Sequence, residues 1–174
     1  VGAFEVELIT ITHSIPEPNA VVLRTAAGAV MHTGDWKLDP DPVVGLSTDE
    51  KRLIEVGEEG ILAMVCDSTN VFIDGVSGSE GGVRENLETL VRRFDKRVAV
   101  ACFASNVARL ETIARVGEAI GRDVALVGRS LWRIYESAKE NGYLKGIRPF
   151  ITEKDVGYLP SDRVLMICTG SQGE

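Results

Sequence analysis

The chain has 174 residues, 44% of them hydrophobic, and a formal net charge of −7, which fits one ordinary globular domain or pieces of two. No apolar run approaches the roughly 20 residues that span a bilayer, and the first residues do not resemble a signal peptide, so we expect no membrane partner. Three cysteines stand singly at the ends of apolar runs. This pattern is typical of reduced thiols, and we expect a cytoplasmic protein.

The first part of the chain is acidic and predicts mainly strands. Residues 1–79 carry a net charge of −9. Apolar alternation or continuous apolar runs predict strands at 4–11, 20–25, 29–32 and 61–66. A helix is expected to begin after Thr48 as its N-cap and to run to about Val56, with Gly57 following its end. Strand 61–66 is apolar throughout and is expected to be buried.

The pattern changes after residue 70 to short apolar strands that alternate with amphipathic helices. The expected helices are 80–94, 106–120 and 130–141, and the expected strands are 97–102, 124–127 and 164–168. Such alternation predicts an α/β, Rossmann-like domain with a parallel sheet and right-handed crossovers. We therefore place a domain boundary near residue 70. Residues 80–174 carry a net charge of +2 and could offer basic side chains to phosphates.

Two residues at strand ends are candidate metal ligands. His13 follows the first strand, and Asp35 follows the third strand after Thr33 and Gly34. Imidazole nitrogen and carboxylate oxygen are both ligands for a divalent metal such as zinc. The sequence contains only one other histidine, His32, whose side chain is expected to point away from that of Thr33. These residues can therefore supply only part of a metal site.

Polar residues at the ends of other strands form a second candidate group. Asp67 closes the apolar strand 61–66 and is either an active-site carboxylate or an Asx-turn residue. The loops of a doubly wound sheet converge at the carboxyl ends of its strands, where hydroxyl, amide and guanidinium groups suit phosphodiester oxygens. Helix capping explains the same residues equally well. The candidates for phosphate contact are Ser79, Ser105, Asn106, Arg109, Ser171 and Gln172.

These motifs, in this order, resemble the metallo-β-lactamase superfamily, its β-CASP branch, and most closely the ribonuclease J group. Residues 12–17 resemble the third metal motif, residues 33–37 the fourth, and residues 66–70 the first β-CASP motif. Residues 78–80, 103–106 and 169–174 resemble the ribonuclease J form of the β-CASP insert. The likeness runs along essentially the whole chain.

The resemblance also has omissions, which predict a piece of a longer protein. The His-x-His-x-Asp-His motif, which supplies most metal ligands and the general base, is absent, and so are the later histidine-bearing motifs. The chain then corresponds to the latter part of the first half-domain of the metallo-β-lactamase αββα fold, residues 1–70, and most of the β-CASP domain, residues 71–174.

For the intact parent the resemblance implies a hydrolase in which two zinc ions generate a hydroxide that attacks a phosphodiester bond of RNA. His13 would be a terminal metal ligand, Asp35 would bridge the two ions, and Asp67 would support the catalytic centre. Because a catalytic zinc normally has about three protein ligands, we expect the isolated chain to hold an incomplete metal site and to be inactive. RNA is the expected partner.

Four other interpretations compete with this one. A β-CASP nuclease acting on DNA would have the same motifs, whereas small-molecule hydrolases of the superfamily lack the α/β insert after residue 70. A non-catalytic RNA-binding or dimerising module would use the apolar surface and open strand edges of residues 1–70, and we expect a homo-oligomer. A dinucleotide-binding domain is disfavoured because no G-x-G-x-x-G motif follows a strand.

Overall fold

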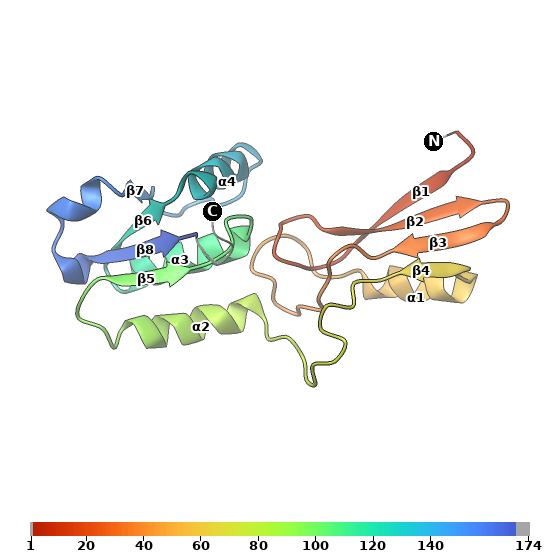
Figure 1. Ribbon diagram of the computed structural model, residues 1–174, viewed down its shortest axis with the longest axis horizontal. Helices are drawn as coiled ribbons and strands as arrows, with labels where there is room; N and C mark the ends of the chain where they lie inside the picture. The colour runs from red at the N-terminus through yellow and green to blue at the C-terminus, as the bar shows by residue number, and fades with distance from the viewer. Residues whose placement is uncertain (1, 170–174) are drawn as a thin grey trace. The chain divides into compact units, whose positions relative to one another are not determined.

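The computed structural model describes residues 2–169, which fall into two compact units that divide between Ser79 and Glu80 (Figure 1). One unit contains a mixed sheet with one helix and the other a parallel sheet with several helices, so the α/β fold class predicted from the sequence is confirmed. The domain boundary near residue 70 stays a prediction, and residue 70 itself lies in an irregular segment within the first unit. Within the described residues, no helix combines the length and apolarity needed to cross a bilayer.

The first unit is a four-stranded sheet with one helix. Its strands lie in the order β1-β2-β3-β4. Neighbours β1, β2 and β3 are antiparallel, and β4 is parallel to β3, so β1, β3 and β4 all run in the same direction. The elements are β1 (Glu5–Thr10), β2 (Asn19–Thr25), β3 (Gly28–His32), α1 (Glu50–Glu59) and β4 (Ala63–Val65).

One face of this sheet forms the core of the first unit. Side chains alternate along a strand, so Ile9, Val22 and Met31 point to the same side and pack with Val56 of α1. The opposite face carries Val6 and Leu8, and both are exposed. Further exposed apolar residues of this unit are Phe4, Ile15, Leu62, Met64, Val65 and Phe72.

Helix α1 differs at both ends from the sequence prediction. Asp49, not Thr48, is the N-cap, and its side chain accepts the Arg52 N–H at 3.0 Å. The helix also continues through Gly57 to Glu59 and ends at Gly60, which has a φ of 97°. Glu59 is held by Arg24 of β2 and by Arg52. These ion pairs keep the last turn helical despite the weak helix propensity of Gly57.

Strand β4 is shorter and more exposed than the apolar run 61–66 predicts. It covers only Ala63–Val65, and all three of its residues are exposed. The prediction of a buried strand is wrong because β4 is the last strand of its four-stranded sheet within the described part of the chain. An apolar run indicates a strand but does not show whether another element covers it.

The second unit has a parallel sheet in the order β5-β8-β6-β7. The parallel βαβ arrangement predicted from the sequence is therefore confirmed. The short strand β7 and two 3-10 helices were not predicted from the sequence. The elements are α2 (Glu80–Val91), β5 (Val98–Ala101), α3 (Val107–Ala119), β6 (Asp123–Val127), α4 (Arg129–Glu140), β7 (Ile151–Thr152), η1 (Asp155–Tyr158), η2 (Ser161–Arg163) and β8 (Val164–Cys168).

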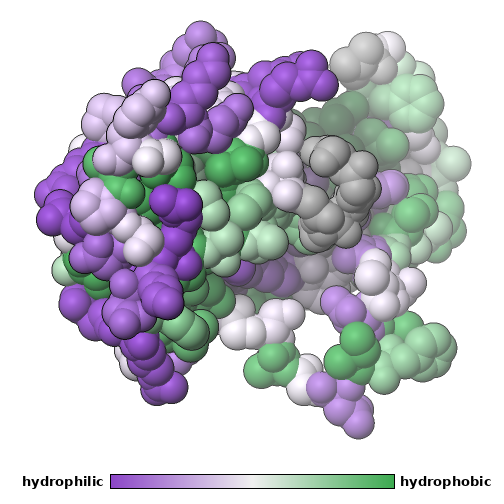
Figure 2. Space-filling model, turned by 60° about the vertical axis from the view of Figure 1, so that its left-hand side comes forward, coloured by the Kyte–Doolittle hydropathy of each residue, from purple (hydrophilic) through white to green (hydrophobic). Residues whose placement is uncertain are grey.

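Helix α3 is the central helix of this unit. It contacts β6 and β8 and packs beside α2 and α4. Close packing is possible because Gly117 faces the sheet, where a Cβ atom would lie 2.3 Å from Val124 Cγ2. Leu110 and Ile113 of the same helix are fully buried. Apolar side chains also reach the surface of this unit among hydrophilic ones (Figure 2), and Phe94 and Phe103 are half-exposed.

Candidate functional site

The topology of the first unit brings three candidate residues to one edge of its sheet. His13 follows β1, Asp35 follows β3 and Asp67 follows β4. Because these three strands run in the same direction, the loops that leave their carboxyl ends lie on the same edge. Three motifs that are far apart in the sequence therefore lie in neighbouring loops of the folded unit.

The carboxylate of Asp67 is held by hydrogen bonds from two loops. Thr69 donates to Asp67 Oδ1 from its hydroxyl at 2.6 Å and from its backbone N–H at 2.9 Å, and the Trp36 N–H donates from the loop after β3. The Thr69 bonds, followed by the Trp36 bond and the charge of nearby His13, lower the pKa of Asp67 below its usual value. Asp67 is therefore an anion at the meeting point of the three loops.

Thr33 joins the loop after β3 to the end of β4. Its backbone N–H donates to Val65 O at 2.9 Å. Its hydroxyl oxygen accepts the Asp67 N–H at 3.1 Å. The Thr33 side chain is buried, so these bonds are shielded from water. Thr33 therefore fixes where Asp67 leaves its strand relative to the turn that carries Asp35.

Thr12 joins the loop that carries His13 to residues 37–39, which follow Asp35 in the next loop. Its carbonyl accepts the Lys37 N–H at 2.9 Å, and its hydroxyl donates to Lys37 O at 2.5 Å. The same hydroxyl accepts the Asp39 N–H at 3.1 Å. The Asp39 carboxylate is buried and pairs with Lys37 Nζ at 2.8 Å. The segment that follows Asp35 is thus tied to the residue that precedes His13.

The two histidines have different hydrogen-bond environments. Ser14 Oγ lies 3.1 Å from Nδ1 of His13, which leaves Nε2 as the ring nitrogen for a ligand or metal. His32 Nδ1 accepts the Gly34 N–H at 2.9 Å and so helps to shape the turn before Asp35. His32 thus acts on the backbone of the turn, and its absence from the proposed ligands stays a prediction.

The donor set fits a metal site only in part. Within residues 2–169, no group of three or more His, Cys, Asp and Glu side chains could hold a metal ion. His13 and Asp35 have the right donor atoms and lie on loops of the same sheet edge. They would have to be joined by donors that the described residues do not supply, because a catalytic zinc needs about three protein ligands.

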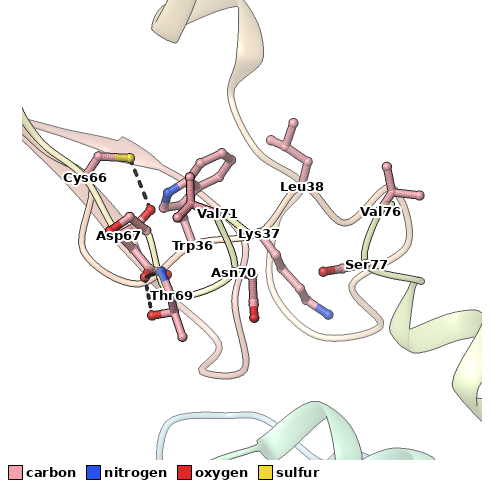
Figure 3. Close-up of a pocket in the computed structure, with 11 residues that line it drawn as sticks. Trp36, Lys37, Leu38, Cys66, Asp67, Thr69, Asn70, Val71, Val76 and Ser77 are labelled. Atoms are coloured by element: carbon pink, nitrogen blue, oxygen red, sulfur yellow. Dashed lines mark hydrogen bonds between the residues drawn. The ribbon is translucent and has the colours of Figure 1, made fainter. Parts of the chain in front are cut away.

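A cavity of about 500 Å³ adjoins this edge within the first unit. Asp67 and Thr69 stand on one side, and Lys37 and Asn70 point into the space (Figure 3). The partly exposed ring of Trp36 contributes an aromatic wall. The remaining lining residues are Leu38, Cys66, Ser68, Val71, Val76 and Ser77.

The candidate phosphate-binding residues of the second part have diverse surroundings. Asn106 is the N-cap of α3, and its Oδ1 accepts the Arg109 N–H at 2.8 Å. Arg109 itself forms a bidentate pair with Glu80. Ser105 is exposed beside this cap, and Ser79 directly precedes α2. Ser171 and Gln172 lie outside the described residues.

Sequence reasoning missed the residues that hold the candidates in place. Thr12, Thr33, Thr69 and Glu80 all make hydrogen bonds to candidate residues or to the loops that carry them. A signal was present, because a threonine is the first residue of both metal motifs. Threonine is common in strands for packing reasons alone, so its type did not distinguish these roles.

Comparison with known proteins adds independent information. Residues 95–174 match the family described as the beta-CASP domain of ribonuclease J. The whole chain is 49% identical to a ribonuclease J from Sinorhizobium meliloti, of which it covers 31%, and 98% of the chain is 39% identical to one from Thermus thermophilus, of which it covers 30%. The chain thus spans about a third of the length of these curated relatives.

A solved structure shares the fold. A protein of unknown function from Enterococcus faecalis superposes on 96% of this chain and 42% of its own chain with a TM-score of 0.62, at 18% identity. Together with the motifs that meet at the edge of the first sheet, the sequence matches show that the chain belongs to the ribonuclease J family, with its β-CASP domain in the second unit.

Proposed function

We propose that this chain forms part of the catalytic unit of a metal-dependent ribonuclease that hydrolyses RNA phosphodiester bonds. The observation that supports the proposal most directly is the convergence of three loops at one sheet edge, where Asp67 contacts the Asp35 loop through Trp36 N–H and lies near His13. A hydrolase of phosphodiesters needs charged groups held in fixed positions around the reacting phosphate. The three loops would provide such a framework.

The residues have separate roles in this proposal. His13, through Nε2, and Asp35, as a bridging carboxylate, would hold two zinc ions together with donors from outside the described residues. Such ions, when bound, lower the pKa of water and offset the negative charge of the phosphodiester. Asp67 would orient His13 and the Asp35 loop. Its lowered pKa means that it stays charged well below neutral pH.

The second unit would contribute the surface for the RNA backbone. Ser105 and the N-terminal end of α3 offer a hydroxyl and a helix N-terminus, groups that contact phosphate oxygens in nucleic-acid complexes. Arg109 would take part only by releasing or sharing its pairing with Glu80. Asn106, Ser171 and Gln172 complete the proposed set in this unit, and Ser79, the last residue of the first unit, directly precedes it.

The test compares the full-length polypeptide that contains this sequence with the isolated chain. We expect zinc-dependent cleavage of a single-stranded RNA by the full-length protein and at least a hundredfold loss in Asp35→Asn and His13→Ala. The isolated chain should be inactive with and without zinc. A matched DNA oligomer separates RNA cleavage from the alternative of a DNA nuclease. Full activity of Asp35→Asn would refute the assigned roles.

A homo-oligomer in the cytoplasm is the proposed state of the protein. Val6, Leu8 and Val65 leave apolar surface exposed on the sheet of the first unit, which a second copy could cover. Light scattering tests this directly, and Leu8→Lys should then shift a dimer to the monomer. If RNA binding persists without cleavage in the full-length protein, the alternative of a non-catalytic binding module gains support.

A further inference from the structure

Thr12 is a buried side chain whose hydroxyl has all of its hydrogen-bonding capacity in use. A hydroxyl offers one proton and two lone pairs. The proton goes to Lys37 O at 2.5 Å, and one lone pair accepts the Asp39 N–H at 3.1 Å. Thr48 Oγ1 lies 3.0 Å away and must be the donor in that pair, because the Thr12 proton is already engaged.

The bonds of the Thr12 hydroxyl connect the segment that carries His13 to the segment that carries Asp35. Thr12 immediately precedes His13. Its hydroxyl bonds Lys37 and Asp39, which follow Asp35 and Trp36 in the chain. The backbone adds a third contact between the same segments, since Lys37 N–H donates to Thr12 O at 2.9 Å. Thr12 and Lys37 form an isolated β-bridge outside the strands of the sheet.

We propose that Thr12 is a positioning residue, whose hydroxyl locks the His13 loop to the Asp35 loop so that the two ligand-bearing loops are held together before any metal binds. The proposal rests on the proposed function for the meaning of His13 and Asp35. The lock itself, meaning the bonds of the Thr12 hydroxyl to Lys37 and Asp39, does not depend on that function. A β-branched threonine suits this role because its χ1 angle is restricted.

Three features distinguish a lock from ordinary core packing. The Thr12 hydroxyl serves two partners in the Asp35 loop, whereas a packing threonine would need only one partner to satisfy its proton. Asp39, whose backbone N–H donates to the Thr12 hydroxyl, has a buried side chain that pairs with Lys37. Asp39 Oδ1 also accepts the Asp41 N–H at 2.9 Å, so the order extends along the loop.

Amide hydrogen exchange of the isolated chain tests the lock without metal. Thr12→Val keeps the shape and removes the hydroxyl, and we expect the Asp39 and Lys37 amides to exchange at least tenfold faster. Thr12→Ser should restore slow exchange. Thr48→Val is the matched control, because it removes a partner of the same hydroxyl but leaves the bonds of that hydroxyl to Lys37 and Asp39. Unchanged exchange in Thr12→Val would overturn the proposal.

A second measurement links the lock to the metal motifs. In the full-length protein, Thr12→Val should weaken zinc affinity by about 10- to 100-fold, the range found when residues that support metal ligands are removed, while Thr12→Ser should bind as the wild type. Val22→Ala, a core substitution away from the loops, controls for lost stability. Wild-type zinc affinity in Thr12→Val would contradict the positioning role. Failure of the wild-type protein to bind zinc, with exchange still accelerated in Thr12→Val, would refute the proposed function and leave the lock in place.

Discussion

The guanidinium of Arg109 lies against both carboxylate oxygens of Glu80, with Nε 3.1 Å from Oε2 and Nη2 3.0 Å from Oε1. The Glu80 side chain is almost fully buried at the first turn of α2, and Arg109 lies in the first turn of α3. A residue predicted to contact phosphate is therefore also the link between the starts of two neighbouring helices. Phosphate binding by Arg109 would have to compete with this carboxylate.

Removing Glu80 should destabilise the second unit more than a conservative change does. Glu80→Ala leaves the Arg109 charge partly buried without its partner and should cost about 3 kcal/mol, whereas Glu80→Gln keeps one acceptor and should cost less. Urea unfolding measured by Trp132 fluorescence in a Trp36→Phe background reports on this unit alone, since the chain has only two tryptophans. Equal stability of Glu80→Ala and the wild type would show that the pair contributes nothing to the fold.

The pair also shows why the sequence located the elements of the second unit better than the roles of their side chains. The helical spacing of apolar residues and a continuous apolar run were sufficient to predict α3 and β8 within a residue or so. The partner of Arg109 could not be predicted, because Glu80 is 29 positions away and meets it only after α2 and α3 pack. Hydrogen bonds between distant loops depend on the register of strands, which single-sequence patterns do not fix.

The first unit illustrates the same limit. The loops bearing His13 and Asp35 were correctly placed at strand ends, since alternation marks where β1 and β3 stop. Their connection through Thr12 requires knowing that Lys37 returns to pair with it across the sheet edge. The exposure of β4 also could not be read from its apolar residues, because burial is a property of the neighbouring elements.

Acid should weaken the first unit through Glu7. Its carboxylate receives hydrogen bonds from Arg52 and Arg24, which lower the pKa of Glu7 to about 2 from its ordinary value of 4.5. A depressed folded-state pKa stabilises the fold above pH 4.5, and this contribution is lost as the pH falls from 4.5 towards 2. Glu7→Gln should lower stability by about 1 kcal/mol at pH 7.

The pH dependence of the stability of the first unit tests whether Glu7 causes its sensitivity to acid. Unfolding is followed by Trp36 fluorescence in a Trp132→Phe background, at pH 7 and at pH 3. The stability difference between wild type and Glu7→Gln should shrink at the lower pH, because the wild-type carboxylate becomes protonated in the unfolded chain. A difference that is the same at both pH values would contradict this assignment. Lys51→Gln is a control, since that side chain is almost fully exposed.

Gly117 should be intolerant of even the smallest side chain. In Gly117→Ala the added Cβ would lie 2.3 Å from Val124 Cγ2, so α3 must shift from the sheet, at a cost of about 1–3 kcal/mol. Gly57→Ala is the contrasting change, because it meets no atom within 4 Å in α1 and should stabilise that helix by about 0.5–1 kcal/mol. The double variant Gly117→Ala/Val124→Ala should recover part of the loss. No recovery would indicate that another contact limits the packing.

The three thiols should react at different rates in the native chain. Cys66 is exposed, Cys168 is partly buried and Cys102 is buried. Burial raises the pKa of the Cys102 thiol to about 11 and also raises that of Cys168. Because the thiolate is the reactive form, Cys102 should stay nearly inert until the pH approaches 11.

A disulfide reagent at pH 8 should therefore modify one thiol per native chain in a fast phase. Cys66→Ser should abolish that phase, while Cys102→Ser should leave it unchanged. All three thiols should react together once guanidinium unfolds the chain, because the protection of Cys102 comes from the packed sheet around it. Fast modification of Cys102 in the folded protein would show that the carboxyl end of β5 opens readily, which would also weaken the case for Ser105 and Asn106 as preorganised phosphate contacts.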